Sequence, residues 1–359
     1  MSDHPHLGGP SHDDDHHHGP TAGPIEVERR KMLYLLGAGL LGAALLPDLA
    51  AEGATSKKRT VKSTTRRVAP TTRKTVTGKV TTVIPAAVDP WTLFPNTVHA
   101  TRAATELIIE STGLPEHQMM VGITNWQQQV PLPQAYSGAN AWRIPLRGLL
   151  ADNPISTKTA LFRGAIALAV NGVPIFNALN NRGEDSFLIG ELDQWGGHCG
   201  RADDYHYHAA PLHLQNISGA ATPIAIALDG FPVYGLTEPD GSPARTLDTF
   251  NGHADSNDTY HYHSTLTYPY INGGMRGAVQ VRDGQVDPQP SAIPIRPSGT
   301  PLRGASITSF TRSGPDVYSL QYRLAAATYR IDYSVGAGTC RFTFTDPSGT
   351  ARTETYQKR

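Results

Sequence analysis

Two segments of sixteen residues carry most of the side chains in this chain that could do chemistry. They run from Asp193 to His208 (DQWGGHCGRADDYHYH) and from Asp248 to His263 (DTFNGHADSNDTYHYH), and they align without a gap. Each begins with an aspartate, has Gly-His at positions five and six, repeats an aspartate at position eleven, and ends in Tyr-His-Tyr-His. This agreement indicates a duplication, and we expect the functional site to lie in these two copies.

The closing Tyr-His-Tyr-His has the period of two that is typical of a strand. Successive side chains of a strand point to opposite faces, so the two histidines of each copy share one face, with Cα atoms roughly 6.5 Å apart. Two such imidazoles can reach one metal ion. The third histidine follows a glycine, which permits a tight turn back over the strand. The predicted metal ligands are His198, His206 and His208 in the first copy, and His253, His261 and His263 in the second.

Three neutral imidazoles with an open coordination position suit zinc, copper, nickel or non-haem iron, and the pattern alone does not choose among them. We expect copper or zinc first, and iron is also compatible. We interpret the aspartates of the two copies as acceptors that orient the imidazole rings, and direct ligation by one of them stays open. These aspartates are Asp193, Asp203, Asp248 and Asp258. Alternating His and Tyr can also form a half-buried strand without an ion, but packing alone would tolerate Phe or Leu where both copies keep all three histidines.

A second repeated pattern precedes each histidine motif. Ile166–Phe176 aligns with Ile224–Tyr234, so each half reads as an apolar strand, an Asn-Gly or Asp-Gly turn, a second strand, a loop and the motif. This duplication predicts a pseudo-twofold arrangement, in which the histidines form either two separate centres or one composite centre. In the first loop, Glu184, Asp185 and Glu191 are expected to face solvent or to supply a carboxylate to the first site.

These motifs together resemble the YHYH domain family of exported proteins. Besides the two Tyr-His-Tyr-His copies, the resemblance rests on AVNGVPIFN (residues 169–177), ALDGFPVYG (residues 227–235) and YPYINGGMRG (residues 268–277), and it covers Leu107 to Val279. It implies export and no particular activity. In family members a cysteine often precedes the Gly-His, whereas here Cys199 follows His198.

Composition sets further bounds. The 359 residues include 31 basic and 31 acidic side chains, a balance that argues against a dedicated nucleic-acid binder. The 35 glycines and 28 prolines favour turns and strands over helices. We therefore predict a mainly β protein with a duplicated, strand-rich YHYH domain and a small all-β C-terminal module.

The start of the chain has the pattern of an export signal. Arg29 and Arg30 precede an apolar run that ends at Leu46, which resembles a twin-arginine signal peptide. We expect a protein handled by the export machinery and located in the periplasm or outside the cell, or anchored to the membrane if the signal stays uncleaved. The predicted divisions are a disordered His- and Asp-rich tail (1–28), the signal (29–54), a basic linker (55–90), the YHYH domain (91–284), a Pro-rich linker (285–304) and the β module (305–359).

Several strands can be placed by their periodicity. Thr105–Glu110 and Gln118–Thr124 are strand-like. The C-terminal module is expected to have three or four strands, at residues 317–324, 328–335, 339–345 and 351–356, with a turn at 346–349.

Two functional classes fit these observations. One is a metalloenzyme, and the other is a non-catalytic metal carrier or cell-surface interaction module. The partner would be a small molecule or an envelope component, and its identity is not encoded in any motif, because the chain has no Gly-rich phosphate loop, Gly-x-Ser-x-Gly or His-Glu-x-x-His. Cys199 and Cys340 could form a disulfide, and Cys199 could instead be a ligand beside His198 or an inert thiol.

Overall fold

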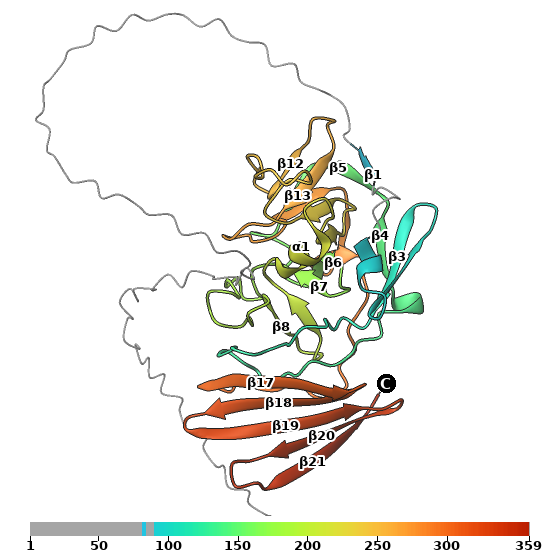
Figure 1. Ribbon diagram of the computed structural model, residues 1–359. Coiled ribbons are helices and arrows are strands. Elements are labelled where there is room, and N and C mark those ends of the chain that lie inside the picture. The colour runs from blue at the N-terminus through green and yellow to red at the C-terminus, as the bar shows by residue number, and fades with distance from the viewer. Residues whose placement is uncertain (1–80, 84–89, 359) are drawn as a thin grey trace, which may run out of the picture. The chain divides into compact units, whose positions relative to one another are not determined.

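The computed structural model describes residues 81–83 and 90–358, and this part of the chain is mainly β (Figure 1). The predicted tail and signal, and most of the basic linker, lie outside the described residues. Within the described ranges, no helix is long and apolar enough to cross a membrane.

An eight-stranded sheet forms the centre of the fold. Its strands are β6 (Ala165–Ala169), β7 (Pro174–Phe176), β8 (Gly197–Cys199), β9 (Tyr205–Tyr207), β10 (Ala225–Ala227), β11 (Pro232–Tyr234), β12 (Gly252–Ala254) and β13 (Tyr260–His263). The strand order is β12-β13-β11-β10-β6-β7-β9-β8, so one four-strand unit appears twice, in opposite directions. At the antiparallel β6–β10 pair, Leu168 lies opposite Ile226, its equivalent in the repeat. The predicted pseudo-twofold axis therefore passes between these two residues.

The two central strands are apolar throughout, as expected for strands that are covered on both faces. All residues of β6 and β10 are buried. Each strand turns into the next through Asn-Gly or Asp-Gly, where Gly172 and Gly230 have φ values of +79° and +86°. Such turns suit the twist of a hairpin, and glycine adopts these angles without steric cost.

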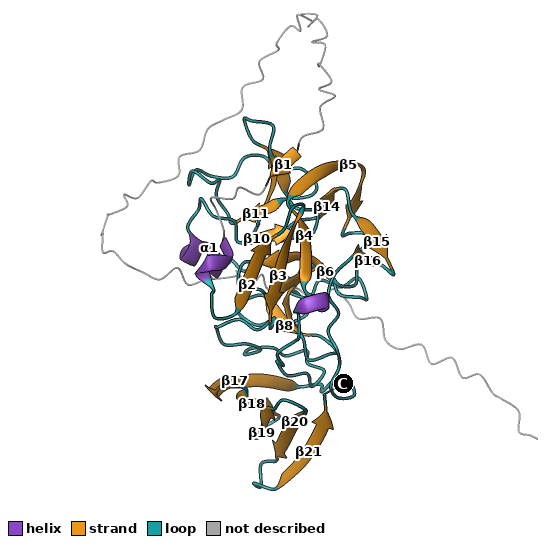
Figure 2. Cartoon of the chain, turned by 90° about the vertical axis from the view of Figure 1, so that its right-hand side faces the viewer, coloured by secondary structure: helices purple, strands orange, loops and turns teal. Residues whose placement is uncertain are grey.

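Smaller sheets and short helices surround the central sheet (Figure 2). They comprise β1 (Thr81–Val83), β5 (Arg147–Ser156) and β14 (Gly274–Gly277); β2 (Val98–Arg102), β3 (Glu106–Ser111) and β4 (Trp142–Pro145); β15 (Gln280–Arg282) and β16 (Gln285–Asp287); helix α1 (His213–Ser218); and 3-10 helices at Pro90–Leu93 and Gly138–Asn140.

One of the two strands predicted near the start of the domain is observed. β3 corresponds to the strand predicted at 105–110. The strand predicted at Gln118–Thr124 is wrong, because Met120 has a φ of +69° and leaves the extended conformation. Its backbone N–H donates a hydrogen bond of 2.8 Å to Asp193, so a contact with the first histidine motif replaces strand pairing.

The C-terminal residues form a five-stranded antiparallel sheet with its strands in chain order (Figure 1). The strands are β17 (Ala305–Gly314), β18 (Val317–Leu324), β19 (Ala327–Val335), β20 (Thr339–Thr345) and β21 (Ala351–Gln357). β18 to β21 match the four predicted strands within one residue, and β17 is an additional one. The predicted turn at 346–349 is also present, with Asp346 Oδ1 accepting backbone hydrogen bonds from Ser348 and Thr350 at 2.9 Å.

This sheet contacts the segments around the first histidine motif. The Tyr333 hydroxyl donates a buried hydrogen bond of 2.8 Å to the backbone carbonyl of Pro131. Arg296 donates from Nε and Nη2 to the two carboxylate oxygens of Asp203, at 2.7 and 2.8 Å, and its guanidinium lies 4.9 Å from the Phe342 ring centroid. The C-terminal sheet thus supports the loop that joins β8 to β9.

The two cysteines are both buried and free. The disulfide between Cys199 and Cys340 is therefore not formed in this structure.

Candidate metal centre

Both histidine motifs fold into the same short hairpin. The Gly-His strand pairs antiparallel with the Tyr-His-Tyr-His strand, so that His198 lies opposite His206 and His253 lies opposite His261. The tyrosine that opens each Tyr-His-Tyr-His crosses directly over the glycine of Gly-His, and a Cβ atom there would clash with its hydroxyl. The glycine is therefore required by close approach, and it places the third histidine beside the other two.

The first aspartate of each motif braces this hairpin. One carboxylate oxygen of Asp193 accepts hydrogen bonds from the backbone N–H groups two and four residues ahead, at 2.9 and 3.1 Å, and the other accepts from the Tyr205 hydroxyl at 2.8 Å. Asp248 repeats the arrangement, with 2.8 and 3.1 Å to the backbone and 3.0 Å to the Tyr260 hydroxyl. The prediction that Asp193 and Asp248 orient the imidazoles is wrong, because their oxygens are occupied by the turn and the tyrosine.

The second aspartate of each motif is a turn residue. Asp203 and Asp258 have φ values of +58° and +59°, in the left-handed region that aspartate tolerates better than most residues. Asp203 also holds Arg296, as described above. The imidazoles of the second hairpin contact Glu238 and the backbone carbonyls of Ala254 and Gly235, so Asp258 does not orient them. The prediction that Asp203 and Asp258 orient imidazoles is therefore wrong as well.

The first centre consists of His198, His206 and His208. His208 Nε2 lies 3.0 Å from His198 Nε2 and 3.1 Å from His206 Nε2. These distances approach the edge of about 3.3 Å expected for a tetrahedron of ligands around an ion with metal–nitrogen bonds of about 2.0 Å. His206 and His208 are buried, and His198 is partly exposed.

Backbone carbonyl groups orient these three imidazoles. The second ring nitrogen in each case faces a carbonyl oxygen: His208 Nδ1 donates to Asn177 at 2.5 Å, His206 Nδ1 donates to Asp204 at 3.0 Å, and the His198 ring bonds to Glu191. A carbonyl accepts and cannot donate, so these contacts hold the proton of each neutral imidazole away from the centre. Three unprotonated Nε2 atoms then point at one another.

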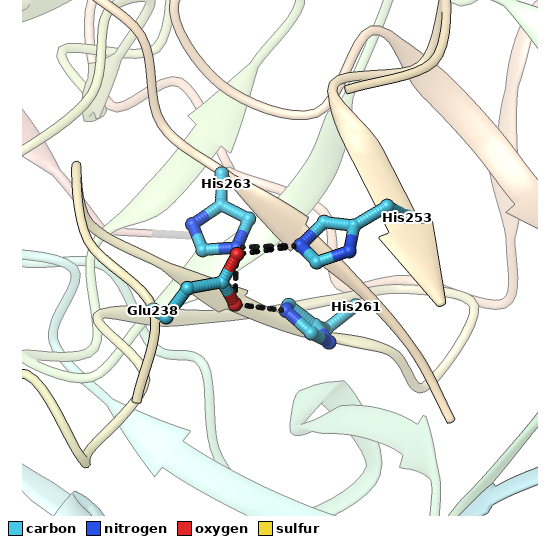
Figure 3. A group of neighbouring side chains, drawn as sticks. All are labelled: Glu238, His253, His261 and His263. Atoms are coloured by element: carbon cyan, nitrogen blue, oxygen red, sulfur yellow. Dashed lines mark hydrogen bonds and ion pairs between the residues drawn. The ribbon is translucent and has the colours of Figure 1, made fainter. Parts of the chain in front are cut away.

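The second centre contains the three predicted histidines and a glutamate (Figure 3). The carboxylate of Glu238 lies 3.1 Å from His253 Nε2, 3.3 Å from His261 Nε2 and 3.5 Å from His263 Nε2. The Nε2 atoms of His253 and His263 are 3.2 Å apart. These separations also match tetrahedral edges, and Glu238 and His263 are almost fully buried, with 6% and 0% of their surface exposed.

Glu238 is the residue that motif reading missed, because it lies outside both sixteen-residue copies. The longer repeat carried no signal for it, because the offset of 58 residues that relates Ile166 to Ile224 relates Glu238 to Asn180. Asn180 does not extend the first centre. Its amide nitrogen donates to Glu184 at 3.0 Å and to Glu191 at 3.3 Å.

The carboxylates of the first loop are not ligands of the first centre. Glu191 is buried rather than exposed, and it forms an ion pair of 2.8 Å with Arg182. Glu184 pairs with the same arginine, and Asp185 accepts a hydrogen bond of 2.8 Å from the Tyr270 hydroxyl. The expectation that Glu191 faces solvent is therefore wrong.

Burial favours the neutral imidazole form of four of these histidines, His198, His208, His261 and His263. Desolvation, with repulsion from His206, lowers the pKa of His208 to about 3. Burial also lowers the pKa values of His261 and His263, although the nearby Glu238 carboxylate opposes the shift. The neutral imidazole is the form that binds a metal ion, so the lowered pKa values of these four histidines favour ligation.

The first centre lies beside a pocket. A pocket of about 260 Å³ opens onto His198, His206 and His208. Its wall includes Met120, Asn125 and Gln129. These residues precede Pro131, whose carbonyl accepts the hydrogen bond from Tyr333 of the C-terminal sheet. The first centre thus has three candidate ligands and space beside them.

Comparison with known proteins places this domain in a family. No curated protein and no solved structure matches the chain. One family of proteins matches a part of the chain that contains the first histidine motif and ends shortly before Asp248, where the second motif begins. Residues 141–244 match the family described as YHYH protein.

Proposed function

We propose that this chain is an exported metalloprotein that binds two transition-metal ions, one at each histidine hairpin. The observation that carries the proposal is the convergence of three Nε2 atoms at 3.0 and 3.1 Å in the first centre, with the ring protons directed at backbone carbonyls. The three Nε2 lone pairs face one another in a buried site, and no hydrogen-bond donor lies between them. A metal cation would accept these three lone pairs.

The two centres support different roles. Three imidazoles and the Glu238 carboxylate complete a four-ligand set in the second centre, as in structural sites, and this N/O donor set suits zinc. The first centre has three imidazoles and a pocket, which is the arrangement of catalytic sites that keep an open position. Zinc, copper or iron is compatible with it.

The pocket favours a metalloenzyme over a metal carrier for the first centre. A metal bound there would supply Lewis-acid or redox chemistry. The chain's own residues would hold the ion with neutral imidazoles, orient the rings through backbone carbonyls and bind the reacting molecule in the pocket.

Metal analysis of the full protein, purified from its native compartment, tests the proposal. We expect about two ions per chain, because each centre has its own set of ligands. Dialysis against a chelator should remove the ion of the open first centre well before that of the closed second centre. Mass spectrometry of the metals and the absorption spectrum give number and identity. Folded protein with no stoichiometric metal contradicts the proposal, and equal loss from both centres contradicts the assignment of open and closed sites.

Export is tested by replacing Arg29 and Arg30 with lysine. If the twin-arginine signal directs export, the full-length precursor should accumulate in the cytoplasm, as measured by cell fractionation and immunoblotting. Arg66 and Arg67 form a second arginine pair without a following apolar run, so the same replacement there is a matched control that should leave export unchanged. Normal export of the Arg29 and Arg30 variant would reject this pathway, though not secretion by another one.

A further inference from the structure

The pocket beside the first centre is lined by positively charged side chains. Three arginines take part, namely Arg163, Arg182 and Arg201. Arg182 is occupied by its ion pairs with Glu184 and Glu191. Arg163 and Arg201 are exposed, and neither forms an ion pair with any residue in the described part of the chain. Two guanidinium groups are therefore available to a ligand.

The charge of the pocket is not balanced by the protein. Glu191 is the one acidic side chain that lines it among the described residues, and Arg182 lies between Glu191 and Glu184. A further carboxylate, that of Asp204, lies 3.5 Å from His206 Nδ1. The three imidazoles are neutral ligands, so a divalent ion held by them keeps its full charge. With Arg163 and Arg201, these carboxylates offset only part of the charge, and the loaded pocket keeps a net positive charge that a neutral molecule would leave uncompensated.

We propose that this pocket binds a small oxyanion, a carboxylate or phosphate group, one oxygen of which occupies the open position of the metal in the first centre. Arg163 and Arg201 contact the remaining oxygens, since guanidinium groups match the geometry of both anions. The pocket volume of about 260 Å³ limits the ligand to a small molecule or to one end of a larger one. This inference rests on the proposed metal function and specifies the class of molecule that the first centre accepts.

Binding of two probes, oxalate and inorganic phosphate, to the metal-loaded full-length protein tests the inference by calorimetry. We expect at least one of them to bind, and the one that binds more tightly distinguishes a carboxylate from a phosphate ligand. The double variant Arg163→Gln and Arg201→Gln should bind it roughly tenfold more weakly or worse, because charged hydrogen bonds are lost. Its metal content should stay unchanged, since neither arginine belongs to the histidine centre.

Two further variants separate the contributions to binding. Arg323→Gln with Arg341→Gln removes two exposed arginines of the C-terminal sheet and should leave probe affinity unchanged. His206→Ala with His208→Ala removes the first centre and should abolish probe binding while the second centre keeps its ion. Equal affinity in this variant, or in the Arg163 and Arg201 variant, overturns the inference.

The outcomes distinguish this inference from the proposed function. Protein that carries two metal ions and binds neither probe overturns the oxyanion ligand and leaves the metalloprotein proposal intact. Protein that takes up no metal at the first centre overturns both.

Discussion

Replacing both His206 and His208 by alanine is expected to lower the metal content from about two ions per chain to about one. Removal of two of three imidazoles leaves too few ligands to hold an ion at the first centre. The His261→Ala and His263→Ala double variant should lose the other half. Metal analysis after desalting measures both results, and circular dichroism shows that the variants remain folded.

The independence of the two losses follows from the strand order. β9 and β13 carry the two Tyr-His-Tyr-His motifs, and four strands lie between them in the central sheet. Each group of ligand atoms is complete on its own hairpin, with Glu238 added at the second. Of the two arrangements that the repeat permitted, the structure has two separate centres, and one composite centre is wrong.

Two controls sharpen this experiment. His99→Ala removes an exposed histidine of β2 and should leave both ions in place. Glu238→Gln keeps all three imidazoles of the second centre and removes only the charge of the fourth ligand, so it should weaken the second ion and leave the first unchanged. Nearly complete metal loss from either double variant would indicate one composite centre instead of two separate ones. Unchanged metal in both would show that the histidines are packing residues.

Replacing Arg296 by methionine is expected to lower the free energy of unfolding by about 3–5 kcal/mol. The side chains of Arg296 and Asp203 are 9% and 4% exposed, and the two form a pair of hydrogen bonds in this buried position. The variant leaves the Asp203 carboxylate buried without its counter-charge, which costs far more than the loss of a surface pair. Chemical denaturation measures the change.

A matched control is available in the same part of the chain. Arg282 pairs with Asp287 at 2.7 Å, but 73% of its side chain is exposed, so Arg282→Met should cost about 1 kcal/mol or less. Adding Asp203→Asn to Arg296→Met should recover part of the stability, because it removes the stranded charge. A loss for Arg296→Met no larger than that of the control would show that the buried pair contributes little.

Arg296→Met should also affect metal binding at the first centre. Asp203 lies in the turn between β8 and β9, which carry His198 and His206. Loosening this turn disturbs the imidazole positions of the first centre and leaves the second hairpin untouched. We therefore expect Arg296→Met to weaken the first ion selectively.

Local pattern was sufficient to predict the six histidines and the two Tyr-His-Tyr-His strands, whereas the strands that carry His198 and His253 were expected to be turns. The period of two places His206 and His208 on one face and Tyr205 and Tyr207 on the other, whatever the rest of the fold. The internal repeat likewise predicted the pseudo-twofold sheet, because similar sequences fold into similar structural units. The C-terminal strands were predicted for the same reason, since their alternation extends over whole hairpins.

Long-range contacts decided the rest, and no spacing within the motifs encodes them. Glu238 reaches the second centre because β11, which it follows in the chain, pairs with β13. Asp193 and Asp203 were misread because their partners include Met120 and Arg296 from distant segments. Backbone carbonyls orient the imidazoles, and every residue has a carbonyl, so composition carries no sign of this role. The separation of the centres depends on strand order, and the pocket depends on side chains brought together from several loops. Sequence alone therefore determined six histidines that could bind metal, and tertiary structure added Glu238, separated the two candidate centres and placed a pocket beside the first.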